Sequence, residues 1–451
     1  MDQGNTGYML LSAALVLLMT PGLAFFYGGL VKAKSVISMM MMSFGAIGLI
    51  AVLWVIYGYA IAFSNGGATF ADGTNSYFGL DGFFGIDISQ INLSNGYDQA
   101  VGAVTDPGDG TAVYGGLSNL AFAAFQATFA IITVALVSGS IADRAKFGAW
   151  MVFAGIWATV VYFPVASWVF NFTLGDNPNA ADFSAANFSD GGWATFGLQN
   201  IFGVGTLDFA GGTAVHINAG AAALALALVL GKRVGFAKGA AVPHNPPFVL
   251  LGAGLLWFGW FGFNAGSELA ADGFASIAFI NTLVAPAAAL LGWIIVEKIK
   301  DGKSTSIGAA SGAVAGLVAI TPACAFLHPL WAIVLGLLAG AVCAIAIELK
   351  FKLGFDDSLD VVGIHLIGGL IGTLYLGFLA QGSGLVFSGS FSQLAVQAIT
   401  AFTVLIYSFV LAFVIGFIIE KTMGFRIKNE DEVAGVDLVV HGEDAYVLDA
   451  K

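Results

Sequence analysis

The chain alternates long apolar runs with short polar segments from one end to the other. Eleven apolar stretches recur, at residues 7–31, 38–63, 118–141, 147–170, 199–230, 248–267, 274–296, 307–327, 330–349, 359–380 and 394–420. Each stretch has at least the roughly 20 residues that a helix needs to cross the hydrocarbon core of a bilayer. The pattern predicts an all-α polytopic membrane protein with eleven transmembrane helices.

The basic residues indicate how these helices are oriented. All sixteen Lys and Arg follow odd-numbered stretches: Lys32, Lys34, Arg144, Lys146, Lys232, Arg233, Lys238, Lys298, Lys300, Lys303, Lys350, Lys352, Lys421, Arg426, Lys428 and Lys451. Basic loops of membrane proteins concentrate on the cytoplasmic side. We therefore expect the N-terminus outside and the C-terminus inside, which requires an odd number of spans.

Composition excludes a water-soluble or disordered chain. Hydrophobic residues make up 58% and charged residues 10% of the sequence, against roughly 25% charged residues in a soluble domain. The 61 glycines indicate close helix packing, because small residues let helix backbones approach in lipid. Cys324 and Cys343 lie in apolar stretches, so we expect no disulfide scaffold and no cysteine metal site. We expect no cofactor and no nucleic-acid partner.

Two longer loops on the expected outer side, 64–117 and 171–198, carry nine Asp and no basic residue. These acids either attract cations or simply keep the loops solvated. The first apolar run lacks a preceding basic segment and is long enough to span, so we expect a membrane helix there and no cleaved signal peptide.

Polar residues at membrane depth are functional candidates because they are costly there. Asp208 precedes His216 by eight residues in the fifth stretch, and Asp357 precedes His365 by the same spacing in the tenth. In a continuous helix this spacing leaves the two side chains about 80° apart on one face and about 12 Å apart in depth.

The two Asp and His pairs lie five spans apart and run in opposite directions. This arrangement predicts a five-plus-five inverted repeat with a site near the midplane. The repeats would cover about residues 7–230 and 248–380, followed by an extra helix at 394–420. Residues 421–451 would form a cytoplasmic tail.

Aromatic residues gather near the expected outer mouth. The sixth stretch places Trp260, Phe263, Asn264 and Ser267 on one helix face. Phe125 and Phe129 lie near the outer end of the third stretch, and Phe170 ends the fourth. Ring faces attract cations by about 0.5–2 kcal/mol, and a hydroxyl accepts a hydrogen bond from an N–H donor. The mouth therefore suits a small ammonium-type cation, with a Ser and an Asn lining the cavity.

Four longer motifs run through these positions: DFAGGTAVHIN at 208–218, GWFGFNAGS at 259–267, FQATF at 125–129 and VGIH at 362–365. Together they strongly resemble the ammonium transporter family (Amt/Mep, related to Rh proteins), and the resemblance runs from about Gly7 to Tyr446.

The resemblance implies a homotrimer in the cell membrane whose protomers each have a pore for ammonium or methylammonium. Ser267, Phe129 and Phe170 would form the outer cation site. Phe129 and Phe263 would form a stacked gate, with Trp260 in the pore wall and Phe125 supporting the vestibule. His216 and His365 would line the lumen, and Asp208 would hold the outer site in shape. The tail would dock a PII-type regulator.

One position departs from the family pattern, which commonly has Trp where this chain has Phe170. Trp is the stronger cation–π partner. Either outer capture is weaker in this protein, or Trp168 compensates from two residues away, which requires an irregular helix end.

The transported species stays open between neutral ammonia and net ammonium. Releasing a proton from an amine of pKa about 10.4 costs roughly 4–5 kcal/mol at pH 7. Placing a bare charge at the bilayer centre costs from about 3 to about 17 kcal/mol, depending on the scale used.

Two other classes of protein compete with a transporter. A membrane enzyme would use Asp356, Asp357 and Asp360 to hold Mg²⁺ and a diphosphate, whereas the same acids also suit the capping of the next helix. An ammonium sensor would keep the fold and signal through the tail.

Overall fold

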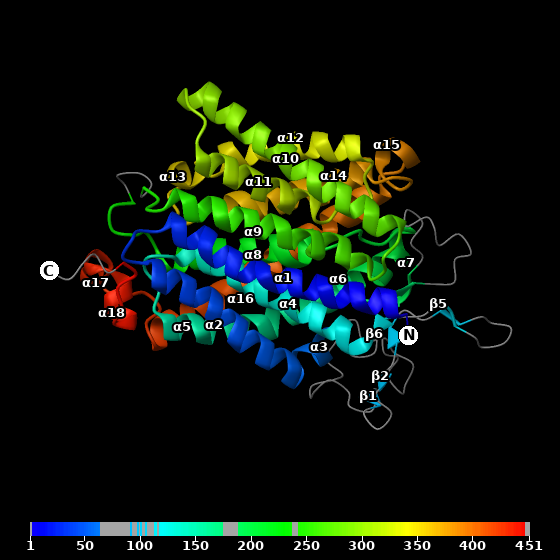
Figure 1. The fold of residues 1–451 in the computed structure, drawn as a ribbon, viewed down its shortest axis with the longest axis horizontal. Coiled ribbons are helices and arrows are strands. Elements are labelled where there is room, and N and C mark those ends of the chain that lie inside the picture. Colours follow the sequence, from blue (N-terminus) through cyan, green and yellow to red (C-terminus); the bar gives the residue numbers. More distant parts are fainter. Residues whose placement is uncertain are drawn as a thin grey trace.

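A computed structural model of the chain describes residues 2–63, 91–92, 97–98, 100–101, 104–105, 112–114, 117–174, 188–236 and 242–446. Within this part, ten helices are long and apolar enough to cross a membrane, and Ser306–Ile320 forms a shorter apolar helix. Most helices run along one axis of the molecule (Figure 1). The all-helical polytopic fold is confirmed. The start of the helix Gln3–Leu30 and the tail helices Asn429–Ala434 and Val436–His441 lie at opposite ends of the bundle, as an odd number of crossings requires, while the count of eleven and the direction stay predictions.

The N-terminal half contains α1 (Gln3–Leu30), α2 (Val36–Leu53), α3 (Tyr59–Phe63), α4 (Asn119–Val137), α5 (Phe147–Trp157), α6 (Phe163–Phe170), α7 (Leu198–Phe202) and α8 (Asn218–Leu230). The C-terminal half contains α9 (Pro246–Ala265), α10 (Gly273–Asp301), α11 (Ser306–Ile320), α12 (Pro329–Ala346), α13 (Leu349–Leu353), α14 (Ile367–Leu379), α15 (Leu385–Ser388), α16 (Ser392–Thr422), α17 (Asn429–Ala434) and α18 (Val436–His441). Five π-helical segments occur among the described residues: Trp54–Gly58, Ala158–Tyr162, Trp193–Gly197, Gly212–Ile217 and Val362–Leu366.

Short strands form four antiparallel pairs in the segments outside the long helices. The pairs are β1 (Ile91–Asn92) with β2 (Tyr97–Asp98), β3 (Ala100–Val101) with β6 (Leu117–Ser118), β4 (Val104–Thr105) with β5 (Ala112–Tyr114), and β7 (Phe172–Leu174) with β8 (Phe188–Gly191). The expectation about the acids of the two outer loops falls on residues whose side chains are outside the described part.

Glycines set the separation of the central helices, as their abundance predicts. A Cβ on Gly252 of α9 would lie 2.2 Å from the backbone nitrogen of Phe26 on α1. A Cβ on Gly340 of α12 would lie 2.0 Å from the carbonyl oxygen of Ala289 on α10. Any side chain at these positions would therefore push the two helices apart.

The fifth apolar stretch is a broken helix, so one sequence-based prediction is wrong. Residues 203–211, between α7 and the π-helical segment η7 (Gly212–Ile217), are not helical. Gly203 and Gly211 have φ angles of +76° and +107°, which glycine adopts readily and which interrupt a helix. Asp208 therefore lies before the helix that carries His216, and the two side chains do not share a helix face.

Two other stretches are shorter as helices than their apolar runs. The tenth begins at the π-helical segment η10 (Val362–Leu366), which continues into α14, and Asp357 again precedes the helix. In the eighth stretch α11 ends at Ile320, and turns follow. An apolar run continues through such turns because they are buried within the protein, where hydrophobicity does not mark where a helix stops.

A buried charge cluster joins separate parts of the chain near the C-terminal end of the bundle. Arg233 lies 2.9 Å from carboxylate oxygens of both Asp143 and Asp356. Burial favours a raised pKa for Asp356, but the hydrogen bonds and the charge of Arg233 outweigh it and lower that pKa below its usual value. The tail packs on the same region, where Glu432 accepts a hydrogen bond from the Val234 N–H at 2.6 Å.

We expect Arg233→Gln to destabilise the protein by about 3–5 kcal/mol, because it leaves two buried carboxylates without their cation. Lys300→Gln is the matched control, since Lys300 pairs with Glu348 at the surface with both side chains more than 40% exposed, and such pairs contribute about 0–1 kcal/mol. Thermal unfolding in detergent measures both.

The ion pair between Arg233 and Asp356 also predicts that stability depends on pH. Because the folded pKa of Asp356 lies below its unfolded value, the stabilisation is present above about pH 4 and is lost as pH falls through the folded pKa. Equal unfolding temperatures for Arg233→Gln and Lys300→Gln would show that the cluster contributes no stability.

Candidate functional site

Asp208 forms the N-terminal cap of the segment that carries His216. Its carboxylate accepts hydrogen bonds from four consecutive backbone N–H groups, those of Gly211, Gly212, Thr213 and Ala214, at 3.1, 2.5, 2.9 and 3.1 Å. The first N–H groups of a helix have no partner within the helix and carry partial positive charge. The carboxylate satisfies these groups and fixes where the helix begins.

Asp357 occupies the equivalent place before His365. Its Oδ2 accepts a hydrogen bond from the Val362 N–H at 2.7 Å. The segment η7 packs against α14, and η10 packs against α8, so each His-bearing segment contacts the helix that continues the other. The two segments therefore pack reciprocally, and the inverted repeat stays a prediction.

The two histidines meet in the middle of the protein. Their Nδ1 atoms are 3.2 Å apart, and the ring centroids are 5.2 Å apart. Both side chains are buried, with 1% and 3% exposed. Because one nitrogen of such a pair donates and the other accepts, one Nδ1 carries a proton and the other does not. The Nε2 of His216 has no partner among the described residues.

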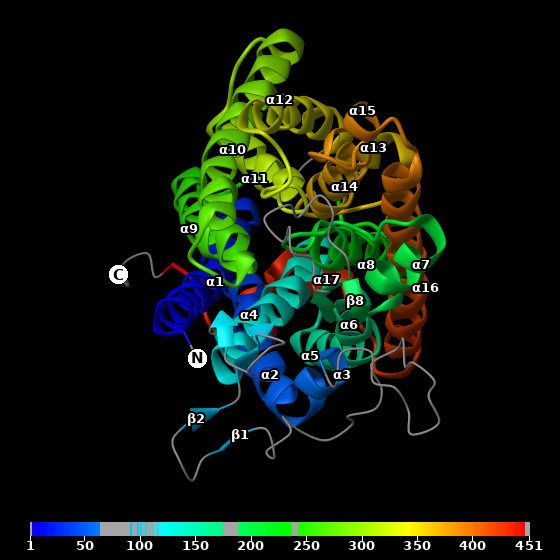
Figure 2. The same cartoon turned by 90° about the vertical axis from the view of Figure 1, so that its right-hand side faces the viewer.

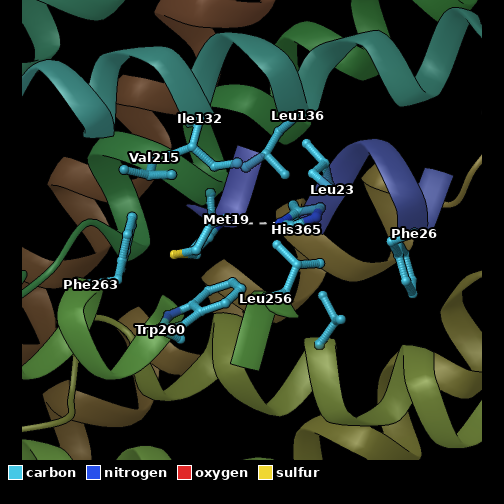
Figure 3. Close-up of a pocket in the computed structure, with 12 residues that line it drawn as sticks. Met19, Leu23, Phe26, Ile132, Leu136, Val215, Leu256, Trp260, Phe263 and His365 are labelled. Atoms are coloured by element: carbon cyan, nitrogen blue, oxygen red, sulfur yellow. Dashed lines mark hydrogen bonds between the residues drawn. The ribbon is translucent and has the colours of Figure 1, made fainter. Parts of the chain in front are cut away.

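A narrow cavity surrounds the histidine pair (Figure 3). Its volume is about 10 Å³ for the centre of a water-sized molecule, which is about what one such molecule needs. The only polar side-chain atoms in the lining belong to His216, His365 and Trp260; the complete lining is Met19, Leu23, Phe26, Ile132, Leu136, Val215, His216, Leu256, Trp260, Phe263, Val314 and His365.

Phe263 lines this cavity and belongs to a group of phenylalanine rings. Phe129 and Phe263 stack at a centroid distance of 4.1 Å with 14° between their planes. Rings at this distance are in van der Waals contact, so no water-sized gap lies between them. Phe125 and Phe170 flank Phe129, with ring centroids 4.8 and 6.3 Å from it.

The polar residues of the sixth stretch have different surroundings. Trp260 stacks on His216 at 5.4 Å and donates its indole N–H to the Thr321 hydroxyl at 2.9 Å. The Ser267 hydroxyl donates to the carbonyl oxygen of Phe263 at 2.8 Å. Asn264 donates to the Thr282 hydroxyl on α10 at 2.9 Å and does not line the cavity. The expectation that Asn264 lines the outer mouth stays a prediction.

Phe170 and Trp168 have different aromatic neighbours. Phe170 contacts Phe129, whereas Trp168 packs against Trp193 and Tyr407 at 5.7 and 4.7 Å. The end of α6 is regular, and its side chains diverge as a helix requires. Trp168 therefore does not take the place of the Trp that Phe170 replaces.

The three acids considered for Mg²⁺ are already engaged with different partners. Asp356 pairs with Arg233, Asp357 caps η10, and Asp360 lies 2.5 Å from the Lys350 ammonium. Among the described residues no group of three or more His, Cys, Asp or Glu is arranged to hold a metal ion. The capping interpretation describes Asp357, and ion pairing describes the other two.

Several polar residues that contact the site from neighbouring segments were not predicted from the sequence. Gln393 and Gln397 of α16 contact the chain just before Asp208, and Thr321 holds Trp260. A signal for the glutamines was present, because Gln393, Gln397 and Thr400 follow the i, i+4, i+7 spacing of one helix face in an otherwise apolar run.

Comparison with known proteins matches residues 7–446 to the Ammonium Transporter Family. The chain is 51% identical to an ammonium transporter of Mycobacterium tuberculosis (strain ATCC 25618 / H37Rv), over 99% of this chain and 90% of that protein. It is 42% identical to the ammonium transporter of Bacillus subtilis (strain 168), over 99% of both chains. Among solved structures it is similar to Saccharomyces cerevisiae Mep2, with a TM-score of 0.75, 30% identity and coverage of 95% and 91%. A structure named "Sensor Amt Protein" gives a TM-score of 0.79 at 25% identity, over 97% and 98% of the two chains.

The multi-pass helical fold with its small, largely apolar cavity fits a membrane channel or transporter. The chain belongs to the Ammonium Transporter Family. Members of this family are transporters and not enzymes, which confirms the prediction of a non-enzymatic membrane protein, and the membership supports ammonium transport.

Proposed function

We propose that the protein captures NH4⁺ at the aromatic mouth, releases its proton there and conducts ammonia, with or without that proton, past His216 and His365. One observation carries the proposal: Phe263, which stacks on Phe129, lines a cavity of single-molecule size whose buried histidines are in hydrogen-bond contact. A larger ion with its hydration shell has no room in this cavity.

The mouth offers favourable interactions to a cation, and the cavity offers few. The ring of Phe170 is half-buried beside Phe129, and ring faces attract cations. Beyond the stacked rings the lining is apolar except for one indole and the two imidazoles. Because a low dielectric disfavours the charged form of an amine, an ammonium ion tends to lose its proton before it passes the rings.

The paired imidazoles suit ammonia as a ligand. When both rings are neutral, the shared proton at the Nδ1 atoms leaves one Nε2 with a proton and the other with a lone pair. The pair then presents one donor and one acceptor whichever way the shared proton lies. Ammonia both donates and accepts, so it can bind either imidazole in an otherwise apolar space.

Uptake of labelled methylammonium into proteoliposomes tests this proposal. We expect protein-dependent, saturable uptake that unlabelled ammonium competes away. Uptake equal to that of empty liposomes would contradict transport by this protein.

The position of Phe170 gives a graded prediction. Because Phe170 lies beside Phe129 and Trp is the stronger cation–π partner, Phe170→Trp should tighten capture by about 0.5–1 kcal/mol, or about two- to fivefold. The half-saturation concentration of methylammonium uptake at equal protein level measures this change. An unchanged or weaker affinity for methylammonium would show that Phe170 is not part of the cation site. A loss of stability alone would indicate a packing role.

The assembly and its regulation belong to the same proposal. We infer a homotrimer in the cell membrane, with a PII-type regulator at the tail. The ordered tail supports such a surface: the Asp437 carboxylate accepts hydrogen bonds from the N–H groups of Ile37 and Ser38, which begin α2, at 3.1 and 2.8 Å. The similarity to a sensor protein keeps a signalling role as the alternative for the tail.

A further inference from the structure

The long helix α16 lies along one side of the bundle, next to α8 and α14 (Figure 2). It belongs to neither half of the predicted repeat. Three polar side chains on one of its faces, Gln393, Gln397 and Thr400, are no more than 1% exposed. Buried polar groups are costly unless they are paired, so these residues need partners within the protein. All three have their hydrogen-bond partners in the non-helical segment that leads to Asp208.

Gln397 binds both backbone polar groups of Leu207. Its Oε1 accepts a hydrogen bond from the Leu207 N–H at 2.8 Å, and its Nε2 donates to the Leu207 carbonyl oxygen at 2.8 Å. This two-bond contact is the one that a neighbouring backbone strand would make. It holds the two peptide groups on either side of Leu207, and the second of these leads into Asp208.

Two further hydrogen bonds complete the Gln397 amide. Its Nε2 also donates to the carbonyl oxygen of Thr373 on α14 at 3.2 Å, and its Oε1 also accepts from Gln393 at 3.2 Å. A glutamine amide has two donor hydrogens and two acceptor lone pairs, so all four positions are used. No other residue type of similar size provides this combination in a neutral side chain.

Gln393 and Thr400 of α16 make similar hydrogen bonds to the residues just before Leu207. Gln393 donates to the carbonyl oxygen of Gly205 at 3.1 Å, and the hydroxyls of Thr206 and Thr400 are 2.6 Å apart. Residues 205–207 are thus held to α16 one after another. This segment has no helix or strand of its own to hold it, and the next residue is the cap of η7.

We propose that Gln397 is a positioning residue that sets the Asp208 cap and, through it, the depth of His216 opposite His365. The Thr373 bond supports this role, because α14 continues from the segment that carries His365. One amide therefore links the cap of the first histidine segment to the helix of the second. Helix α16 thereby holds the two histidine-bearing segments at a fixed position relative to each other.

The functional part of this inference rests on the proposed transport, so the test measures structure and transport separately. Gln397→Leu removes all four hydrogen bonds, and Gln397→Glu, when ionised, keeps the acceptors but lacks both donors. Tyr407→Phe is the matched control on α16, because it removes one hydrogen bond to the carbonyl oxygen of Val160 and touches no part of residues 203–218 through that hydroxyl.

Hydrogen exchange of the full-length protein in detergent measures how firmly the backbone around the Asp208 cap is held. We expect both Gln397 variants to exchange about tenfold or more faster at the amides of residues 207–214, with unchanged exchange in α4 and α9. Tyr407→Phe should match the wild type over 207–214. If Gln397→Leu fails to fold, Gln397→Glu carries the measurement.

Methylammonium uptake by the same proteins provides the functional reading. We expect the Gln397 variants to lower the maximal rate at least about tenfold, and to lower it more than Tyr407→Phe does at equal thermal stability. Wild-type exchange at residues 207–214, or wild-type kinetics in a folded Gln397 variant, would overturn the inference. Wild-type protein without uptake would instead refute the proposed function, and the exchange result would still decide whether Gln397 positions the cap.

Discussion

Replacing His216 or His365 with alanine is expected to abolish ammonium transport or to change the transported species. The two imidazoles form one unit, since their Nδ1 atoms are 3.2 Å apart in a cavity with almost no other polar group. Removing one ring leaves the other without its hydrogen-bond partner and enlarges the cavity. We therefore expect the double variant to lose little more than either single variant, because the effects of contacting residues are not additive.

His328→Ala is the matched control for this prediction. His328 is exposed and caps α12 through its own Nδ1, outside the cavity lining. It should keep wild-type flux and selectivity, measured as methylammonium uptake and its competition by ammonium and potassium. Wild-type behaviour of both cavity variants would show that the histidine pair is not part of the pathway.

Asp208→Ala is expected to reduce folded yield and transport together. The substitution leaves four buried N–H groups without their acceptor, and each unsatisfied buried group costs about 1–3 kcal/mol. Even partial relaxation of the segment leaves a loss of more than about 3 kcal/mol. Size-exclusion yield, thermal unfolding and uptake at equal protein level measure the three effects.

Asp208→Asn separates a structural role from direct binding of the cation. Its amide keeps one acceptor oxygen of the cap but removes the negative charge, so we expect intermediate stability and measurable transport. A stable Asp208→Ala protein whose only defect is a higher half-saturation concentration would make Asp208 a direct ligand for ammonium.

Much of the fold follows from the sequence because the bilayer imposes simple rules. Each predicted apolar stretch corresponds to a helix or to a broken helix in the described part of the chain. The spacing of Asp208 and His216 repeats at Asp357 and His365, and the two histidines do meet. The rings of Phe125, Phe170 and Phe263 also gather around Phe129.

The breaks within the spans could not be predicted from hydrophobicity. Residues 205–211 are buried in protein, where an irregular backbone is tolerated at membrane depth, so their apolar character hides the end of α7. At Leu207 the missing helix hydrogen bonds are replaced by the amide of Gln397, which lies 190 residues further along the chain. Contacts over such distances depend on the packing of α16, which a single sequence does not specify.

Current recorded from proteoliposomes on a solid-supported membrane after an ammonium jump, with the internal pH followed by a trapped dye, tests the central claim most directly. The account predicts a protein-dependent response that saturates with ammonium and is absent after an equal potassium jump, because potassium has no proton to release at the mouth. A current would assign net ammonium transport, and a pH change without current would assign ammonia. No response to ammonium, or an equal response to potassium, would contradict the account.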